Sequence, residues 1–308
     1  MVNPRKKICL LVCGSIPGLE NQKIAAWLNN LPELNIIAAV ESFLVFNKNS
    51  ANIGPAVWLK LAAAIKQKLN HFNGFVVLHD LDQILFTSAA LSFLLPKISR
   101  PVVFASSQGL SPASSRLETK TNLINAAQVA SLNFNEVGLI FGNRLLRANQ
   151  AEQDEPDKFR VPESGLLGRI DFSIRIFEKA LFKAEGKTKS LNQLNDNLAL
   201  VYAQPLLTSP AIIRQSLKKA GLIINLADYQ KIPEAILAAL PQISRELPVV
   251  LWWPQGNAAS LLTKNIILIN NLTWPTAVVK LMWALGQTNK VQKIKDLLTT
   301  NIAGEFLN

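Results

Sequence analysis

Polar side chains that could carry out hydrolysis follow two apolar runs of the sequence. His79, Asp80 and Asp82 come directly after one run, and Ser106 and Ser107 end another. A serine activated by a histidine, which a carboxylate in turn orients, is a common nucleophile for acyl transfer. The G-x-S-x-G turn that exposes such a serine in α/β hydrolases is absent around both serines. We therefore interpret them as turn-capping residues and keep a serine and histidine hydrolase as one open hypothesis.

Nucleotide, metal and disulfide chemistry receive no support from the sequence. Gly14 and Gly18 lack the spacing of a dinucleotide fingerprint or of a phosphate-binding P-loop. Cys9 and Cys13 are the only cysteines. An extended chain would hold them about 13 Å apart, too far for a disulfide or a shared metal. Since the chain has only two histidines in addition, we expect no metal site and no cofactor.

Length, charge and hydropathy narrow the class of protein. The chain has 308 residues, and a typical domain has roughly 150, so we expect two domains. Lys and Arg outnumber Asp and Glu by 32 to 21, and the net charge of +11 favours polyanions as nonspecific partners without identifying one. The apolar run Ile8–Cys13 is too short for the apolar region of a signal peptide. The sequence also has no apolar run of about 18 residues, the length that a membrane-spanning helix needs. We expect a cytoplasmic protein without membrane contacts.

Short apolar runs alternate with segments of helical periodicity along the chain, which indicates an α/β fold with parallel sheets covered by helices. A helix beginning at Pro55 would have an apolar face made of Trp58, Leu61, Ala62, Ile65 and Leu69. The runs predicted as buried strands of a first domain are Ile8–Cys13, Ile36–Val40, Phe75–Leu78, Val102–Ala105 and Val137–Phe141.

A polar segment separates these runs from a second α/β region. Ala184–Asn197 is charged and without periodicity, which is typical of an exposed connector. We predict an N-terminal domain over residues 1–185, a linker over 186–196 and a smaller C-terminal domain over 197–308. The predicted strands of the second domain are Leu198–Tyr202, Leu222–Asn225, Val249–Trp252 and Ile266–Ile269, and one predicted helix is Pro210–Ala220.

Several segments, taken in order, resemble the L-asparaginase family, which includes cytoplasmic type I asparaginases and the related D subunit of an archaeal tRNA-dependent amidotransferase. GFVVLHDLDQ over Gly74–Gln83 is similar to the family's GFVVLHGTDT, and NKNSAN over Asn47–Asn52 precedes a helix with Pro and Trp. The resemblance covers nearly the whole chain. Further matching segments are Pro101–Gln108, Glu136–Arg147, Leu272–Gly286 and Thr300–Glu305.

The resemblance implies an N-terminal flavodoxin-like parallel sheet domain, a smaller C-terminal α/β domain and a homodimer. Sites in open parallel sheets lie outside the carboxyl ends of the strands. There the resemblance makes Ser15 the nucleophile and places Asn49, Ser50, His79 and Asp82 around an amino-acid-like substrate. Asp82 would hold the α-amino group of the substrate, and Ser50 its carboxylate. Asp82 taken alone could equally be a solvated loop carboxylate.

Four features depart from the family's catalytic pattern. Ser15 replaces the threonine nucleophile, and Leu81 replaces the second catalytic threonine with a side chain that has no hydroxyl. Gln153 stands where the family has a lysine. Only Pro17–Gln22 separates the first strand from the next helix, where the family has a mobile flap of roughly 15 to 20 residues. The effects of these changes multiply, because nucleophile, proton relay and closure act on one reaction.

We therefore favour a pseudoenzyme that binds an asparagine-like or aspartate-like ligand with little or no turnover. The alternative is an active L-asparaginase or related amidohydrolase in which Ser15 attacks the amide. A nucleic-acid-binding protein is less favoured, because the basic residues form no motif interleaved with aromatic residues. Its candidate contacts are Arg144, Arg147, Lys179, Lys183, Lys187 and Lys189.

Overall fold

The structure, a computed structural model, describes residues 5–14, 24–46, 52–106, 115–155, 158–183, 193–205, 209–256 and 265–307. The chain divides into two units, residues 1–188 and 189–308. Most of the predicted linker lies outside the described residues, so the limits of the two domains stay a prediction.

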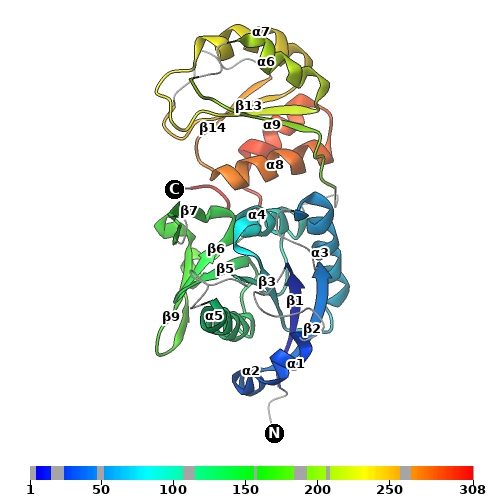
Figure 1. Cartoon of the computed structure of the whole chain (residues 1–308), viewed down its shortest axis with the longest axis vertical. Helices are drawn as coiled ribbons and strands as arrows, with labels where there is room; N and C mark the ends of the chain where they lie inside the picture. Colours follow the sequence, from blue (N-terminus) through cyan, green and yellow to red (C-terminus); the bar gives the residue numbers. More distant parts are fainter. Residues whose placement is uncertain are drawn as a thin grey trace. The chain divides into compact units, whose positions relative to one another are not determined.

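An eight-stranded sheet forms the centre of the first unit (Figure 1), in the order β10-β9-β6-β5-β4-β3-β1-β2. The five strands β1 to β5 run parallel, and the last three strands continue the sheet in antiparallel pairing. The central strands are buried along almost their whole length, as expected for strands covered on both faces. The strands are β1 (Lys7–Cys13), β2 (Ala39–Phe46), β3 (Gly74–His79), β4 (Val102–Ser106), β5 (Val137–Phe141), β6 (Arg144–Arg147), β9 (Leu166–Ile170) and β10 (Ile174–Ile176).

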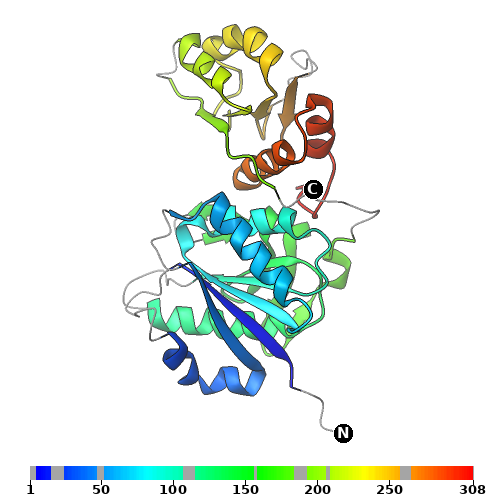
Figure 2. The same ribbon diagram turned by 90° about the vertical axis from the view of Figure 1, so that its right-hand side faces the viewer.

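Helices cover both faces of this sheet (Figure 2). One face packs against α1 (Ile24–Asn29), α2 (Pro32–Ile37) and α5 (Ser115–Ala130). The other is covered by α3 (Pro55–Lys68) and α4 (Ile84–Leu94). The helix predicted from Pro55 is confirmed, and Trp58 on its buried face donates a hydrogen bond from Nε1 to Oγ1 of Thr87 in α4 at 3.0 Å. A separate ribbon consists of β7 (Glu152–Glu155) and β8 (Lys158–Arg160).

The second unit has a four-stranded parallel sheet in the order β11-β12-β13-β14. Its core on one face is formed with α6 (Pro210–Arg214) and α7 (Glu234–Glu246). The other face is covered by α8 (Trp274–Gln287) and α9 (Val291–Thr299), as Figure 1 shows. The predicted α/β class is therefore confirmed. The strands, all close to their predicted positions, are β11 (Leu198–Tyr202), β12 (Gly221–Asn225), β13 (Val249–Trp252) and β14 (Ile266–Ile269).

The prediction of a strand over Ile36–Val40 is wrong. The apolar run is divided between two elements, because Pro32 begins a helix that includes Ile36 and Ile37, and pairing with β1 begins only at Ala39. β2 is the edge strand of the sheet and its exposure varies along the strand, and Glu41 and Ser42 interrupt its apolar residues.

The antiparallel extension of the first sheet was not predicted. β6, β9 and β10 have three to five residues each and carry arginines among their apolar residues. Such short, partly charged runs lack the apolar continuity that identified β1, β3 and β4. The predicted helix Pro210–Ala220 is also shorter in the structure, since α6 gives way to a 3₁₀ turn at Gln215.

In the second unit, a buried ion pair joins Lys280 of α8 to Glu305 in the segment after α9. The Nζ of Lys280 lies 2.6 Å from the Oε1 of Glu305, and both side chains are fully buried. The ammonium also donates to the carbonyls of Leu298 and Thr300 at 2.9 and 2.6 Å. The Glu305 carboxylate in turn accepts backbone N–H groups of Ile302 and Ala303. Every charge in this pair therefore has several partners.

Replacing Lys280 with methionine should destabilise the second unit by about 3–5 kcal/mol, because the buried Glu305 carboxylate loses its counter-ion. Urea unfolding followed by tryptophan fluorescence measures this, since four of the six tryptophans lie in residues 189–308. The matched control is Lys290→Met, which removes an exposed lysine. An unchanged unfolding midpoint for Lys280→Met would contradict the structural role of the pair.

Candidate functional site

Four parallel strands of the first unit end side by side at one edge of the sheet. Cys13 of β1 is the register partner of both Phe46 in β2 and His79 in β3, and His79 is the partner of Ser106 in β4. Gly14 then donates its N–H to the carbonyl of Phe46 at 2.9 Å. This is the edge at which open parallel sheets bind their ligands.

Some of the five predicted site residues belong to the described part of the chain, and the others do not. Ser15, Asn49 and Ser50 follow the ends of β1 and β2 in the sequence but lie outside the described residues. His79 and Asp82 are described, at the end of β3 and in the 3₁₀ turn Leu81–Gln83 that follows it. The structure therefore places two of the five predicted residues at this edge.

His79 is fully buried at the end of β3. Its Nδ1 lies 2.7 Å from the backbone carbonyl oxygen of Asp80, and its ring lies 6.0 Å from that of Phe104. Burial lowers the pKa of His79 to about 4, so at neutral pH the ring is uncharged, with Nδ1 as the donor to the carbonyl. Its buried Nε2 has no hydrogen-bond partner within the described structure. Ser106 therefore does not pair with this nitrogen, and Ser107 lies outside the described residues.

Asp80 is a buried carboxylate at this edge that the sequence reasoning did not select as a site residue. Its side chain is 1% exposed. A Cβ atom on Gly14 would lie only 2.7 Å from the carboxyl carbon of Asp80, and Gly14 has a φ of +118°. Only glycine fits there, because the backbone conformation and the carboxylate both exclude a side chain. The replacement could have been noticed in the motif GFVVLHDLDQ, because the family motif that it resembles has glycine at the position of Asp80.

Cys13, which precedes Gly14, is not equipped to act as a nucleophile. Burial raises the pKa of its thiol to about 12, and the nearby Asp80 contributes to the rise, while Lys60 opposes it. The thiolate is the reactive form of cysteine, so this residue stays inert at neutral pH. Lys60 itself donates from Nζ to the carbonyl of Val45 at 2.8 Å.

The side chains that follow Asp80 differ in exposure. Asp82 is exposed and Leu81 is half-buried in the same short turn. Gln153, which the resemblance aligns with the family lysine, is exposed on β7 of the separate ribbon. The turn after β3 therefore presents one solvent-accessible carboxylate, that of Asp82, next to the aliphatic side chain of Leu81.

Arg147 belongs to the protein interior, which corrects its assignment to a possible nucleic-acid surface. Its guanidinium pairs with both carboxylate oxygens of Glu136, at 2.7 and 3.1 Å. It also donates to the backbone carbonyls of Ser164 and Ala180. Of the other basic candidates, Arg144 is half-buried, Lys179 and Lys183 are exposed, and Lys187 and Lys189 lie outside the described residues.

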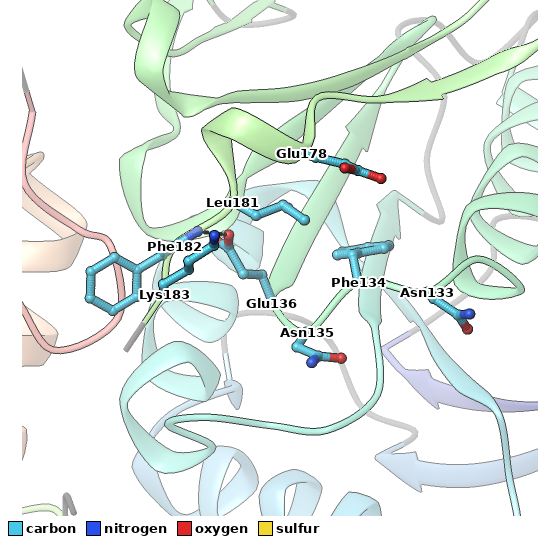
Figure 3. Close-up of a pocket in the computed structure, with 8 residues that line it drawn as sticks. All are labelled: Asn133, Phe134, Asn135, Glu136, Glu178, Leu181, Phe182 and Lys183. Atoms are coloured by element: carbon cyan, nitrogen blue, oxygen red, sulfur yellow. Dashed lines mark hydrogen bonds between the residues drawn. The ribbon is translucent and has the colours of Figure 1, made fainter. Parts of the chain in front are cut away.

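A cavity of about 410 Å³ lies at the amino end of β5, away from the strand ends described above (Figure 3). Figure 3 shows that its walls come from the segment just before β5 and from residues 178–183. Glu136 lines it, but both carboxylate oxygens already bind Arg147. Neither His79 nor Asp82 lines it. The lining residues are Asn133, Phe134, Asn135, Glu136, Glu178, Leu181, Phe182 and Lys183.

Within the described ranges, no group of three His, Cys, Asp or Glu side chains is arranged to hold a metal ion. The helices of those ranges include none that is both long and apolar enough to cross a membrane.

Acidification should destabilise the protein through His79. The unfolded histidine titrates near pH 6.5, whereas folding lowers the pKa to about 4. Between these values the unfolded state binds more protons, so stability falls as the pH falls, by about 2 kcal/mol at pH 5. In urea unfolding at several pH values, His79→Asn should lose this part of the pH dependence. The exposed His71, changed to Asn, is the control, and equal pH dependence in both variants would contradict the assignment.

Comparison with known proteins agrees with the geometry of the first unit. The family model described as "Asparaginase, N-terminal" matches residues 16–182. The chain is 24% identical over 285 residues to the D subunit of the glutamyl-tRNA(Gln) amidotransferase of Thermoplasma volcanium, covering 86% of this chain and 70% of that protein. It is 27% identical over 307 residues to the corresponding protein of Pyrococcus furiosus, covering 90% and 69%.

Solved structures of asparaginases share the fold. L-asparaginase I from Vibrio cholerae superposes with a TM-score of 0.85 at 24% identity, covering 99% of this chain and 100% of that one. The thermostable L-asparaginase from Thermococcus kodakarensis gives 0.82 at 21% identity, covering 98% and 99%. The sheet order, the position of the strand ends and a family match over more than half of the residues lead to one conclusion: the chain belongs to the asparaginase family.

Proposed function

We propose that this protein binds an asparagine-like or aspartate-like ligand at the carboxyl ends of β1 to β3 and hydrolyses it very slowly or not at all. The observation that carries the proposal is Leu81, which stands at the position of the family's second catalytic threonine in the turn after β3. A leucine side chain can neither accept nor donate a proton. A serine hydroxyl at Ser15 would thus lack the partner that activates a nucleophile.

Two further features support loss of the proton relay. Gln153 has an amide where the family has a lysine, and its side chain is exposed on the β7–β8 ribbon. Asp80 adds a buried carboxylate where the family has glycine, against the backbone next to Ser15. General acid–base help contributes about 10²–10⁴-fold to such reactions, so its loss alone would leave slow turnover.

Binding is supported by the position of Asp82. Its carboxylate is exposed at the end of a buried strand, where a ligand's α-amino group can reach it. By resemblance, Ser50 and Asn49 would contact the rest of the ligand. The neutral, buried His79 would position the strand end instead of touching the ligand.

The assembly and location of the protein are parts of the same proposal. We propose a homodimer of subunits that each have two domains, with a linker over residues 186–196. The relatives from Thermoplasma volcanium and Pyrococcus furiosus are named as subunits of an amidotransferase, which supports association with other chains. A cytoplasmic location is supported by the similar fold of a protein from Campylobacter jejuni described as a probable cytoplasmic L-asparaginase.

Calorimetric titration with aspartate and asparagine, combined with an ammonia assay on the same sample, tests the proposal. We expect binding of at least one ligand and no ammonia above background. Asp82→Ala should weaken binding by about 10- to 150-fold, because a hydrogen-bonded charge pair is lost. Glu246→Ala, which removes an exposed carboxylate at the end of α7, is the matched control and should bind like the wild type.

Two results would contradict this function. Ammonia release at ordinary enzyme rates that disappears in Ser15→Ala would establish the alternative, an active amidohydrolase with a serine nucleophile. Absence of heat with both amino acids, in a sample whose unfolding midpoint shows it to be folded, would exclude ligand binding at this site.

A further inference from the structure

Three arginines lie side by side across neighbouring strands at the β10 edge of the first sheet. Arg169 in β9 is the register partner of Arg144 in β6 and of Arg175 in β10. Directly opposed residues in antiparallel strands point to the same face, so the three side chains form one row. Adjacent strands are about 5 Å apart, and the row therefore spans about 10 Å. We refer to Arg144, Arg169 and Arg175 as the arginine row.

The arginine row keeps most of its charge uncompensated. Within the described structure, the guanidinium of Arg169 takes part in no hydrogen bond or ion pair, and its side chain is exposed. Among the described residues, Arg175 has one exposed ion-pair partner, Asp171, at 3.3 Å. The side chain of Arg144 donates there to the backbone carbonyl of Phe159 at 2.9 Å.

Two carboxylates of the ribbon next to Arg144 are already paired with another arginine. Glu152 and Asp154 of the ribbon pair with Arg160, at 2.8 and 2.9 Å. Like charges directly opposite each other on two strands destabilise a sheet. The arginine row therefore costs folding free energy that a bound anion would offset.

A fully exposed phenylalanine lies in the turn that joins β9 to β10, three residues along the chain from both Arg169 and Arg175. Phe172 is at the tip of the β9–β10 hairpin, and its side chain has the largest exposure among the described large apolar residues. The turn that presents it is held in place, since Asn143 donates from Nδ2 to Oδ1 of Asp171 at 2.9 Å. The N–H of Asp171 also donates to the carbonyl of Ser173 at 3.2 Å. The aromatic ring is thus presented to solvent on a fixed turn.

We propose that the arginine row and Phe172 bind a single-stranded nucleic acid, with the row contacting successive phosphates and Phe172 stacking on a base. Evenly spaced cations beside an aromatic platform are the combination by which proteins hold single strands without reading their sequence. The proposal goes beyond the amino-acid site, which lies at the carboxyl ends of β1 to β3, whereas the arginine row crosses β6, β9 and β10. It does not depend on that site.

The observations favour a nucleic acid over a protein partner. A protein interface needs an apolar centre from which charged residues are depleted. Phe172 is the exposed large apolar residue of this hairpin, and the other two among the described residues of the first unit, Ile36 and Leu44, belong to α2 and β2 near the opposite edge of the sheet. A single exposed ring on a hairpin whose two strands carry Arg169 and Arg175 suits base stacking better than burial in a protein core.

Fluorescence anisotropy of a labelled twelve-residue oligouridylate with the full chain tests the proposal. Single-stranded binding weakens with salt by a slope of about −0.7 for each phosphate contacted, so three contacts predict a slope of about −2. Arg169→Ala/Arg175→Ala should lower the affinity at least tenfold and reduce the slope to about −0.7. Phe172→Ala should lower the affinity by roughly 5- to 150-fold with an unchanged slope, because stacking involves no counter-ion release.

The controls separate this surface from the general positive charge. Lys290→Ala/Lys293→Ala removes two exposed charges from the second unit and should bind like the wild type. Inorganic polyphosphate should compete for the arginine row, and Phe172→Ala should not change that competition. Affinity unaffected by the double arginine variant, or no salt-sensitive binding at 50 mM salt, would overturn the proposal. An equal loss of polyglutamate binding in Phe172→Ala would also overturn it and indicate an acidic protein partner.

Discussion

The contact between the Asp80 carboxylate and Gly14 is the constraint on which the candidate site depends. It joins the residue after β1 to the residue after β3. Only glycine fits at the first position, because its φ is +118° and a Cβ atom there would lie 2.7 Å from the carboxyl carbon of Asp80. The neighbours of the two residues, Cys13 and His79, are register partners and fully buried. Burial keeps both uncharged at neutral pH, since it raises the pKa of one and lowers that of the other. The side chains at this part of the strand edge are therefore buried in the interior, and the carboxylate that solvent can reach is that of Asp82.

Each of the two units contains a buried ion pair that joins two of its segments. Arg147 with Glu136 ties β6 to the segment before β5, and Lys280 with Glu305 ties α8 to the last residues. Each charge also binds backbone groups, which is the condition for burying ions without a large loss of stability. The arginine row, in which Arg169 and Arg175 are exposed, contrasts with these pairs, because its charges have few partners in the described structure. The chain itself compensates the charges of these two pairs, whereas the arginines at the β10 edge form the proposed nucleic-acid site.

The sequence allowed prediction of those elements whose signal is a continuous apolar run. β1, β3, β4 and β5 are buried on both faces and were located almost to the residue, whereas the edge strand β2 contains polar residues and was misplaced. Cross-strand neighbours are set by register, so the row of Arg144, Arg169 and Arg175 could not be seen in the sequence. Asp80 was visible as a substitution in the family motif, but its burial against Gly14 depends on how the two strands end.

Loss of the proton relay is tested most directly by intact-mass spectrometry of the chain after mixing with excess asparagine. Attack by Ser15 on the side-chain amide would release ammonia and leave an aspartyl ester on the serine. Loss of the relay predicts an unchanged mass at all mixing times, because a hydroxyl without a proton acceptor forms the ester too slowly for it to accumulate. An aspartyl adduct that maps to the peptide containing Ser15, and that is absent in Ser15→Ala, would contradict it.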